Sequence, residues 1–91
     1  MRALQSDTIY EARIQKYNIV NGHMRFLLTN LIDEAGNIIE HIWLTKTTYK
    51  MRDIILDKYH STRSIKFEGQ VYTYQRANGS TDKNLKLIKI Y

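Results

Sequence analysis

The order of hydrophobic patterns along this chain restricts the folds that it can adopt. Five runs have the composition or the period-two alternation of β-strands, and one helical run, Thr48–Tyr59, separates the third from the fourth. The strand-like runs are Thr8–Val20, Met24–Ile32, Ile38–Thr45, Ser64–Arg76 and Leu85–Tyr91. The order β-β-β-α-β-β in 91 residues therefore predicts a small all-β domain with one helix.

Two turn sequences connect the first three runs. Asn21-Gly22 predicts a type I′ hairpin, because both central positions of that turn need positive φ. The polar segment Asp33–Asn37, which contains Gly36, suits a second hairpin. With the first run also pairing with the fourth, we expect a five-stranded OB-like Greek-key barrel. One domain should span residues 1–91, with Met1–Asp7 as a loose lead-in or an edge extension.

Alternation within the runs divides the side chains between two faces. In the third run, Ile42 and Leu44 supply an apolar face, which turns His41 and Trp43 to the other side. Trp43 is then either an outer, partly exposed ring or a core residue, and we favour the outer position. Gly69, inside the fourth run, predicts a bulge or a sharp bend.

Two further segments complete the expected architecture. Thr47 or Thr48 can cap the helix, and the stripe of Met51, Ile54, Ile55 and Tyr59 suits a helix that plugs one end of the barrel. The segment Ala77–Asn84 is predicted to be the longest polar loop.

Composition narrows the class of function. The chain has no cysteine, which excludes disulfides and thiolate metal sites, and it has no long apolar run or secretory signal, so we expect a cytoplasmic protein. Its net charge is +5, and the charge is uneven: residues 1–45 carry four basic and five acidic side chains, whereas residues 46–91 carry ten and four. A basic half can attract a polyanion through counterion release.

The polar residues form no recognisable catalytic or metal-binding pattern. His23, His41 and His60 lack metal-ligand spacing, and Asp53 with Asp57 is better explained as the solvated face of a helix. We therefore predict a protein that is not an enzyme and that uses no cofactor and no metal.

One segment carries a resemblance to a known group. Within Ile32–Leu44, a D-x-x-G-N turn leads into the residues Glu-His-Ile-Trp, and Ile65–Val71 is followed by Tyr74. This arrangement resembles small bacterial OB-fold-like proteins with an E/D-H-x-W strand motif, which are often carried on plasmids, phages or other mobile elements. The similarity spans Glu11–Tyr91 and implies the OB fold, with single-stranded nucleic-acid binding as a tendency of the class. The chain departs from the group at Tyr59–Ser64, where the group has a Gly-Asp turn.

Aromatic and basic residues give the functional hypothesis. Proteins that bind single strands combine a positive groove with rings on which bases stack. The candidate residues for binding nucleic acid are Lys16, Tyr17, Arg25, His41, Trp43, Lys46, Tyr72, Tyr74, Arg76 and Lys83. We expect single-stranded DNA or RNA to be the partner, bound with little sequence preference.

Two other readings account for the same basic surface. The domain could be a protein-interaction module of a phage or mobile element that docks on a host nucleic-acid enzyme, since charge also steers protein association. It could also form a homodimer through an exposed edge, with the first or the fifth strand at the seam.

Overall fold

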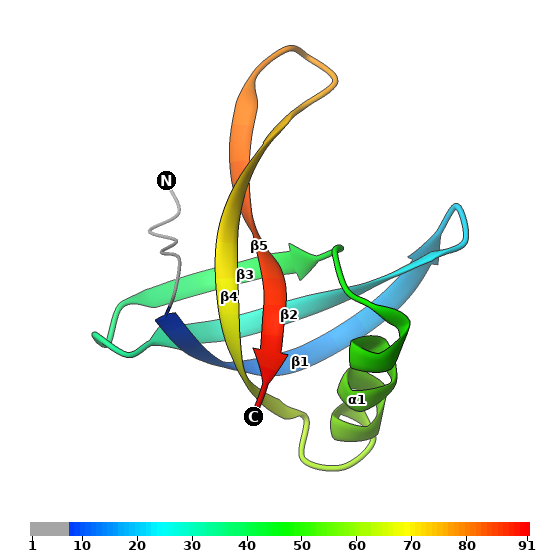
Figure 1. The fold of residues 1–91 in the computed structure, drawn as a ribbon, viewed down its shortest axis with the longest axis vertical. Coiled ribbons are helices and arrows are strands. Elements are labelled where there is room, and N and C mark those ends of the chain that lie inside the picture. The colour runs from blue at the N-terminus through cyan, green and yellow to red at the C-terminus, as the bar shows by residue number, and fades with distance from the viewer. Residues whose placement is uncertain (1–7) are drawn as a thin grey trace.

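The fold is a curled antiparallel half-barrel with one helix. The computed structural model describes residues 8–91, so the lead-in expected for Met1–Asp7 lies outside the described residues. The elements are β1 (Thr8–Val20), β2 (His23–Asp33), β3 (Ile38–Leu44), α1 (Tyr49–Tyr59), β4 (Ser64–Gln75) and β5 (Thr81–Ile90) (Figure 1). The expected order β-β-β-α-β-β is confirmed.

One sheet contains all five strands in the order β3-β2-β1-β4-β5. The expected meander of β1, β2 and β3 is present, and β1 also pairs with β4 from Thr8 to Arg13. Because β1 is paired on both sides there, it can offer an edge for a homodimer only in its second half. The ends of the sheet are β3 and β5. The far part of β4 and β5 rises from the sheet as a long hairpin (Figure 1), which we call the hairpin arm (residues 71–85).

Both predicted turns have the expected geometry. Asn21 and Gly22 adopt φ of 52° and 79°, as a type I′ turn requires, and Gly36 adopts φ of 86°. Asp33 organises the second turn, because its carboxylate accepts hydrogen bonds from the backbone N–H groups of Ala35 and Asn37 and from the side-chain amide of Asn37.

Two bulges that the sequence did not reveal set the faces of β1 and β2. Gln15 is an extra residue in β1, and Asn30, with φ of 54°, is an extra residue in β2. After Gln15 the alternation of β1 is reversed. Lys16 therefore joins Leu27 and Trp43 in a cross-strand row on the outer face.

A single hydrophobic cluster fills the inside of the curl. Its fully buried large side chains are Tyr10, Ile14, Phe26, Leu28, Leu31, Ile42, Leu44, Ile55, Phe67 and Leu85. Thr48 caps the N-terminus of α1, because its hydroxyl accepts from the N–H of Met51 at 3.2 Å. The helix buries Ile55, while Met51 and Tyr59 pack against the cluster. Within residues 8–91, no helix has the length and apolar character needed to cross a membrane.

The fifth strand differs from the expectation. It begins at Thr81, so the polar loop predicted over Ala77–Asn84 is shorter, and Thr81–Asn84 are paired with β4. The prediction was wrong because ladder hydrogen bonds to β4 outweigh the weak strand propensity of this segment. The irregularity predicted at Gly69 is confirmed, although the extra residue is Ile88 of β5. A Cβ on Gly69 would lie 3.3 Å from Leu85 Cδ2, a tight contact that would require the Leu85 side chain to shift by a few tenths of an ångström.

Candidate nucleic-acid interface

A cavity of about 500 Å³ lies between the outer face of β2–β3 and the hairpin arm. Six of the ten candidate residues line it: Arg25, Trp43, Lys46, Tyr72, Tyr74 and Arg76. They come from three separate stretches of sequence, which the curl of the sheet and the arm bring together. We call this cavity the aromatic groove.

Trp43 forms one wall of the aromatic groove. Its indole is half-buried on the outer face of β3 and is not part of the hydrophobic cluster, so the favoured outer position is confirmed. The guanidinium carbon of Arg25 lies 4.7 Å from the ring centroid, and Lys16 Nζ lies 6.0 Å from it. Arg25 Nε donates to Asn18 Oδ1 at 3.1 Å, which fixes the guanidinium over the indole. The contacts of Arg25 and Lys16 with the Trp43 ring both lie within cation–π range.

Tyr72 and Tyr74 form the opposite wall, on the hairpin arm. Their ring centroids are 6.1 Å apart, and both rings are half-buried. Lys46 Nζ lies 4.5 Å from the centroid of Tyr72. The hydroxyls of Thr45 and Tyr72 are within hydrogen-bonding distance at 3.3 Å, so the end of β3 contacts the arm directly.

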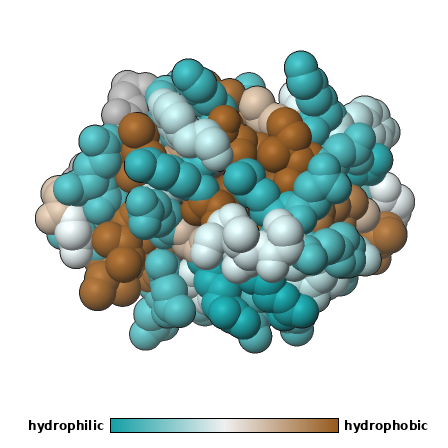
Figure 2. Space-filling view, turned by 90° about the horizontal axis from the view of Figure 1, so that it is seen from below, coloured by the Kyte–Doolittle hydropathy of each residue, from teal (hydrophilic) through white to brown (hydrophobic). Residues whose placement is uncertain are grey.

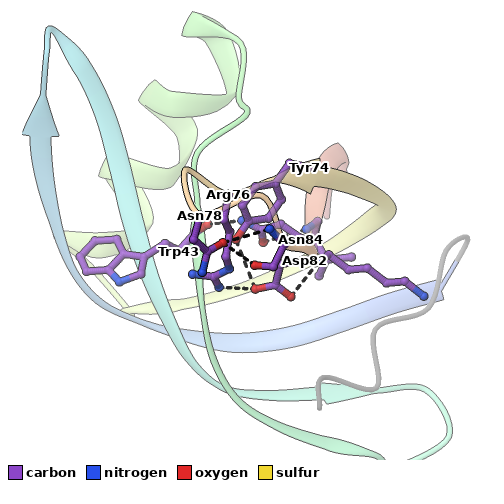
Figure 3. Close-up of polar contacts among 9 residues, drawn as sticks. Trp43, Tyr74, Arg76, Asn78, Asp82 and Asn84 are labelled. Atoms are coloured by element: carbon purple, nitrogen blue, oxygen red, sulfur yellow. Dashed lines mark hydrogen bonds and ion pairs between the residues drawn. The ribbon is translucent and has the colours of Figure 1, made fainter.

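Arg76 is held at the rim of the aromatic groove by an acidic neighbour. Its guanidinium forms an ion pair with Asp82 and lies 5.9 Å from the centroid of Tyr74, whose hydroxyl donates to Asp82 at 3.4 Å (Figure 3). The hydrogen bond and the charge of Asp82 raise the pKa of Arg76 above its usual range. Arg76 therefore stays cationic, and Asp82 offsets part of its field.

Asn84 connects the two walls, and sequence reasoning did not single it out. It is buried in β5, and its amide Nδ2 donates to the backbone carbonyl of Trp43 at 2.8 Å (Figure 3). Asn84 is the last residue of the segment predicted to be a loop, Ala77–Asn84, and its burial results from pairing with β4, which has no local sequence signal. No backbone ladder joins β3 and β5, so this side-chain bond spans the gap between them.

Four candidate residues lie outside the groove lining. Tyr17 is 38% exposed and lies on the side of the sheet away from Trp43, with its ring centroid 6.1 Å from that of Phe26 and 5.6 Å from that of Tyr59. Lys83 is paired with Thr73, and alternation places it on the face of the arm opposite Tyr72 and Tyr74. The remaining two, His41 and Lys16, are exposed near Trp43, His41 two residues before it and Lys16 beside its ring.

Charge distinguishes the aromatic groove from two cavities near the other end of the sheet. One of those cavities is lined by Arg13, Lys58 and Lys66 beside Glu11, and the other by Lys66 beside Glu11, Asp33 and Glu34, so both mix basic with acidic side chains. Among the described residues that line the aromatic groove, three are basic and none is acidic. Comparison of the chain with protein-family models, curated proteins and solved structures found no match.

Proposed function

We propose that this domain binds single-stranded nucleic acid in the cytoplasm, with little sequence preference and without a cofactor. The observation that carries the proposal is the pairing of rings with cations in the aromatic groove. Trp43, Tyr72 and Tyr74 each have a basic side chain within 6.0 Å of the ring centroid. Rings and cations interleaved along one groove match the two parts of a nucleotide, the flat base and the anionic phosphate.

The mechanism follows from those contacts. An unpaired base can stack on a tyrosine or tryptophan ring, and such stacks contribute about 1–3 kcal/mol each. Every base has a π face, so stacking tolerates any sequence, whereas a duplex keeps its bases stacked on one another. Arg25, Lys46 and Arg76 supply phosphate contacts that release counterions.

A fluorescence-anisotropy titration with labelled oligo-dT at two salt concentrations tests the proposal. Affinity should fall log-linearly with salt, with a slope near −0.7 per neutralised phosphate. Trp43→Ala and Tyr72→Ala should each weaken binding by about 1–3 kcal/mol. Tyr91→Ala, which removes an exposed ring outside the groove lining, is the matched control and should leave affinity unchanged.

A second candidate function has one specific observation in its favour. Ile32 and Ile38 are cross-strand neighbours at the far end of β2–β3, and they are 44% and 74% exposed. Other exposed apolar side chains are scattered among polar ones on the underside of the molecule (Figure 2). An apolar pair of this kind suits a protein partner. Absence of oligonucleotide binding at about 50 mM salt and micromolar protein would favour a module of a phage or mobile element that docks on a host nucleic-acid enzyme.

A further inference from the structure

A second cavity adjoins the aromatic groove at Thr45. It has a volume of about 440 Å³ and lies between the β1–β2 turn and the start of α1. Thr45 lines both cavities, and from there the chain runs on through Lys46 in the groove to Thr47 and Thr48 in the second cavity. We call this second cavity the helix-end pocket. The two cavities therefore share Thr45, and the segment that joins β3 to α1 leads from one cavity to the other.

The helix-end pocket repeats the pairing of a ring with a cation. Tyr49 is 77% exposed, and the guanidinium carbon of Arg52 lies 4.6 Å from its ring centroid. Tyr49 lies outside the hydrophobic cluster, so its ring does not contribute to the core. Tyr49 is thus available as a stacking surface, as Trp43 and Tyr72 are in the groove.

Arg52 has an unfilled hydrogen-bonding position. Its Nε is buried and has no hydrogen-bond partner among the described residues, although a buried donor ordinarily has one. His23, Thr47 and Thr48 line the same pocket, and none of the described lining residues is acidic. This arrangement suits an anion with several acceptor oxygens, such as a phosphodiester.

We propose that a bound single strand continues past Thr45 into the helix-end pocket, where Tyr49 stacks on a further base and Arg52 contacts a phosphate. The inference rests on the proposed function and extends its site from three rings to four. Binding should therefore depend on the length of the oligonucleotide, because only a longer strand reaches both cavities.

The test compares oligo-dT of about 4 and about 12 nucleotides, within the range of lengths that a single OB fold covers. Tyr49→Ala should weaken binding of the longer strand by roughly 5- to 150-fold, the equivalent of one stacked base, and leave the shorter strand unaffected. Trp43→Ala should weaken binding of both strands. Tyr91→Ala should change neither, and circular dichroism should show that all three variants remain folded.

The outcomes separate the two proposals. If Tyr49→Ala and Arg52→Gln leave the longer strand bound as tightly as before while Trp43→Ala weakens both strands, the strand ends in the aromatic groove. The extension is then wrong and the proposed function stands. If the unmodified protein binds neither strand, both proposals fail.

Discussion

The side-chain amide of Asn84 donates a hydrogen bond of 2.8 Å to the backbone carbonyl of Trp43, and these residues belong to two strands that share no ladder. Asn84 Oδ1 in turn accepts from the N–H of Leu85 at 2.8 Å. One buried amide therefore satisfies a carbonyl of β3 and an N–H of β5. It fixes the distance between the tryptophan wall and the tyrosine wall of the aromatic groove.

Asn84→Leu tests this connection. It removes the donor and leaves the Trp43 carbonyl without its partner, so the free energy of unfolding should fall by about 1–3 kcal/mol in urea denaturation. Lys86→Ala, at an exposed position of the same strand, should change it by less than about 0.5 kcal/mol. Equal losses in the two variants would show that Asn84 has no special role.

Removing the acidic partner of Arg76 should strengthen binding. In Asp82→Asn the guanidinium loses its ion pair and is freer to contact a phosphate, so affinity for oligo-dT should rise roughly two- to fivefold at about 50 mM salt. The gain should vanish near 1 M salt, where the Debye length is about 3 Å. Asp57→Asn, on the exposed side of α1, is the control. An equal gain in that variant would indicate an effect of net charge alone.

Asp33, at the turn between β2 and β3, should make the free energy of unfolding depend on pH in the acid range. Hydrogen bonds from the Asn37 side chain, and from the backbone N–H groups of Asn37, Ala35 and Gly36, hold the pKa of Asp33 below its ordinary value of 3.8, while burial opposes them. A carboxyl whose pKa is lower in the folded state stabilises the fold above its unfolded pKa, and this stabilisation is lost as pH falls through the folded pKa.

Denaturation midpoints measured between about pH 2 and pH 6 will check this dependence. In Asp33→Asn the midpoint should change less with pH over this range. In Asp57→Asn, which removes an exposed carboxylate, the midpoint should depend on pH as it does in the unmodified protein. An unchanged slope in Asp33→Asn would contradict the role assigned to the turn.

Arg63 occupies a position that favours glycine. Its φ is 60°, its N–H donates to the Lys58 carbonyl and its own carbonyl accepts from Ile14, each at 2.8 Å. A left-handed conformation costs a side-chain-bearing residue about 1–2 kcal/mol. Arg63→Gly should therefore be about 1 kcal/mol more stable than Arg63→Ala in urea denaturation, since both variants lose the same contact with the Tyr59 ring. Equal stability of the two would show that the backbone here is unstrained.

Local sequence signals predicted most of the fold. Asn21-Gly22 correctly predicted the first hairpin turn, and the alternation around Ile42 and Leu44 correctly predicted that Trp43 lies on the outer face. The turn after α1 could not be assigned in the same way. The group that the chain resembles has a Gly-Asp turn there, which this chain lacks, and Arg63 adopts the positive φ instead.

Features that depend on strand pairing were missed. The bulges at Gln15 and Asn30 place one extra residue in each of two paired strands, so the register is the same at both ends of the pair, and neither bulge has a local sequence signal. They explain why Lys16, and not Tyr17, lies beside Trp43. The start of β5 was missed for the same reason, and with it Asn84.

The turn at the tip of the hairpin arm can accept insertions without disturbing the rest of the fold. The turn is closed by local bonds, since Arg76 N–H donates to the Ser80 carbonyl at 2.7 Å and Ser80 N–H donates to Asn78 Oδ1 at 3.0 Å. No residue of the turn belongs to the hydrophobic cluster. Insertions at Asn78-Gly79 can therefore lengthen the arm while the framework stays constant, which makes the reach of the domain adjustable independently of its folding.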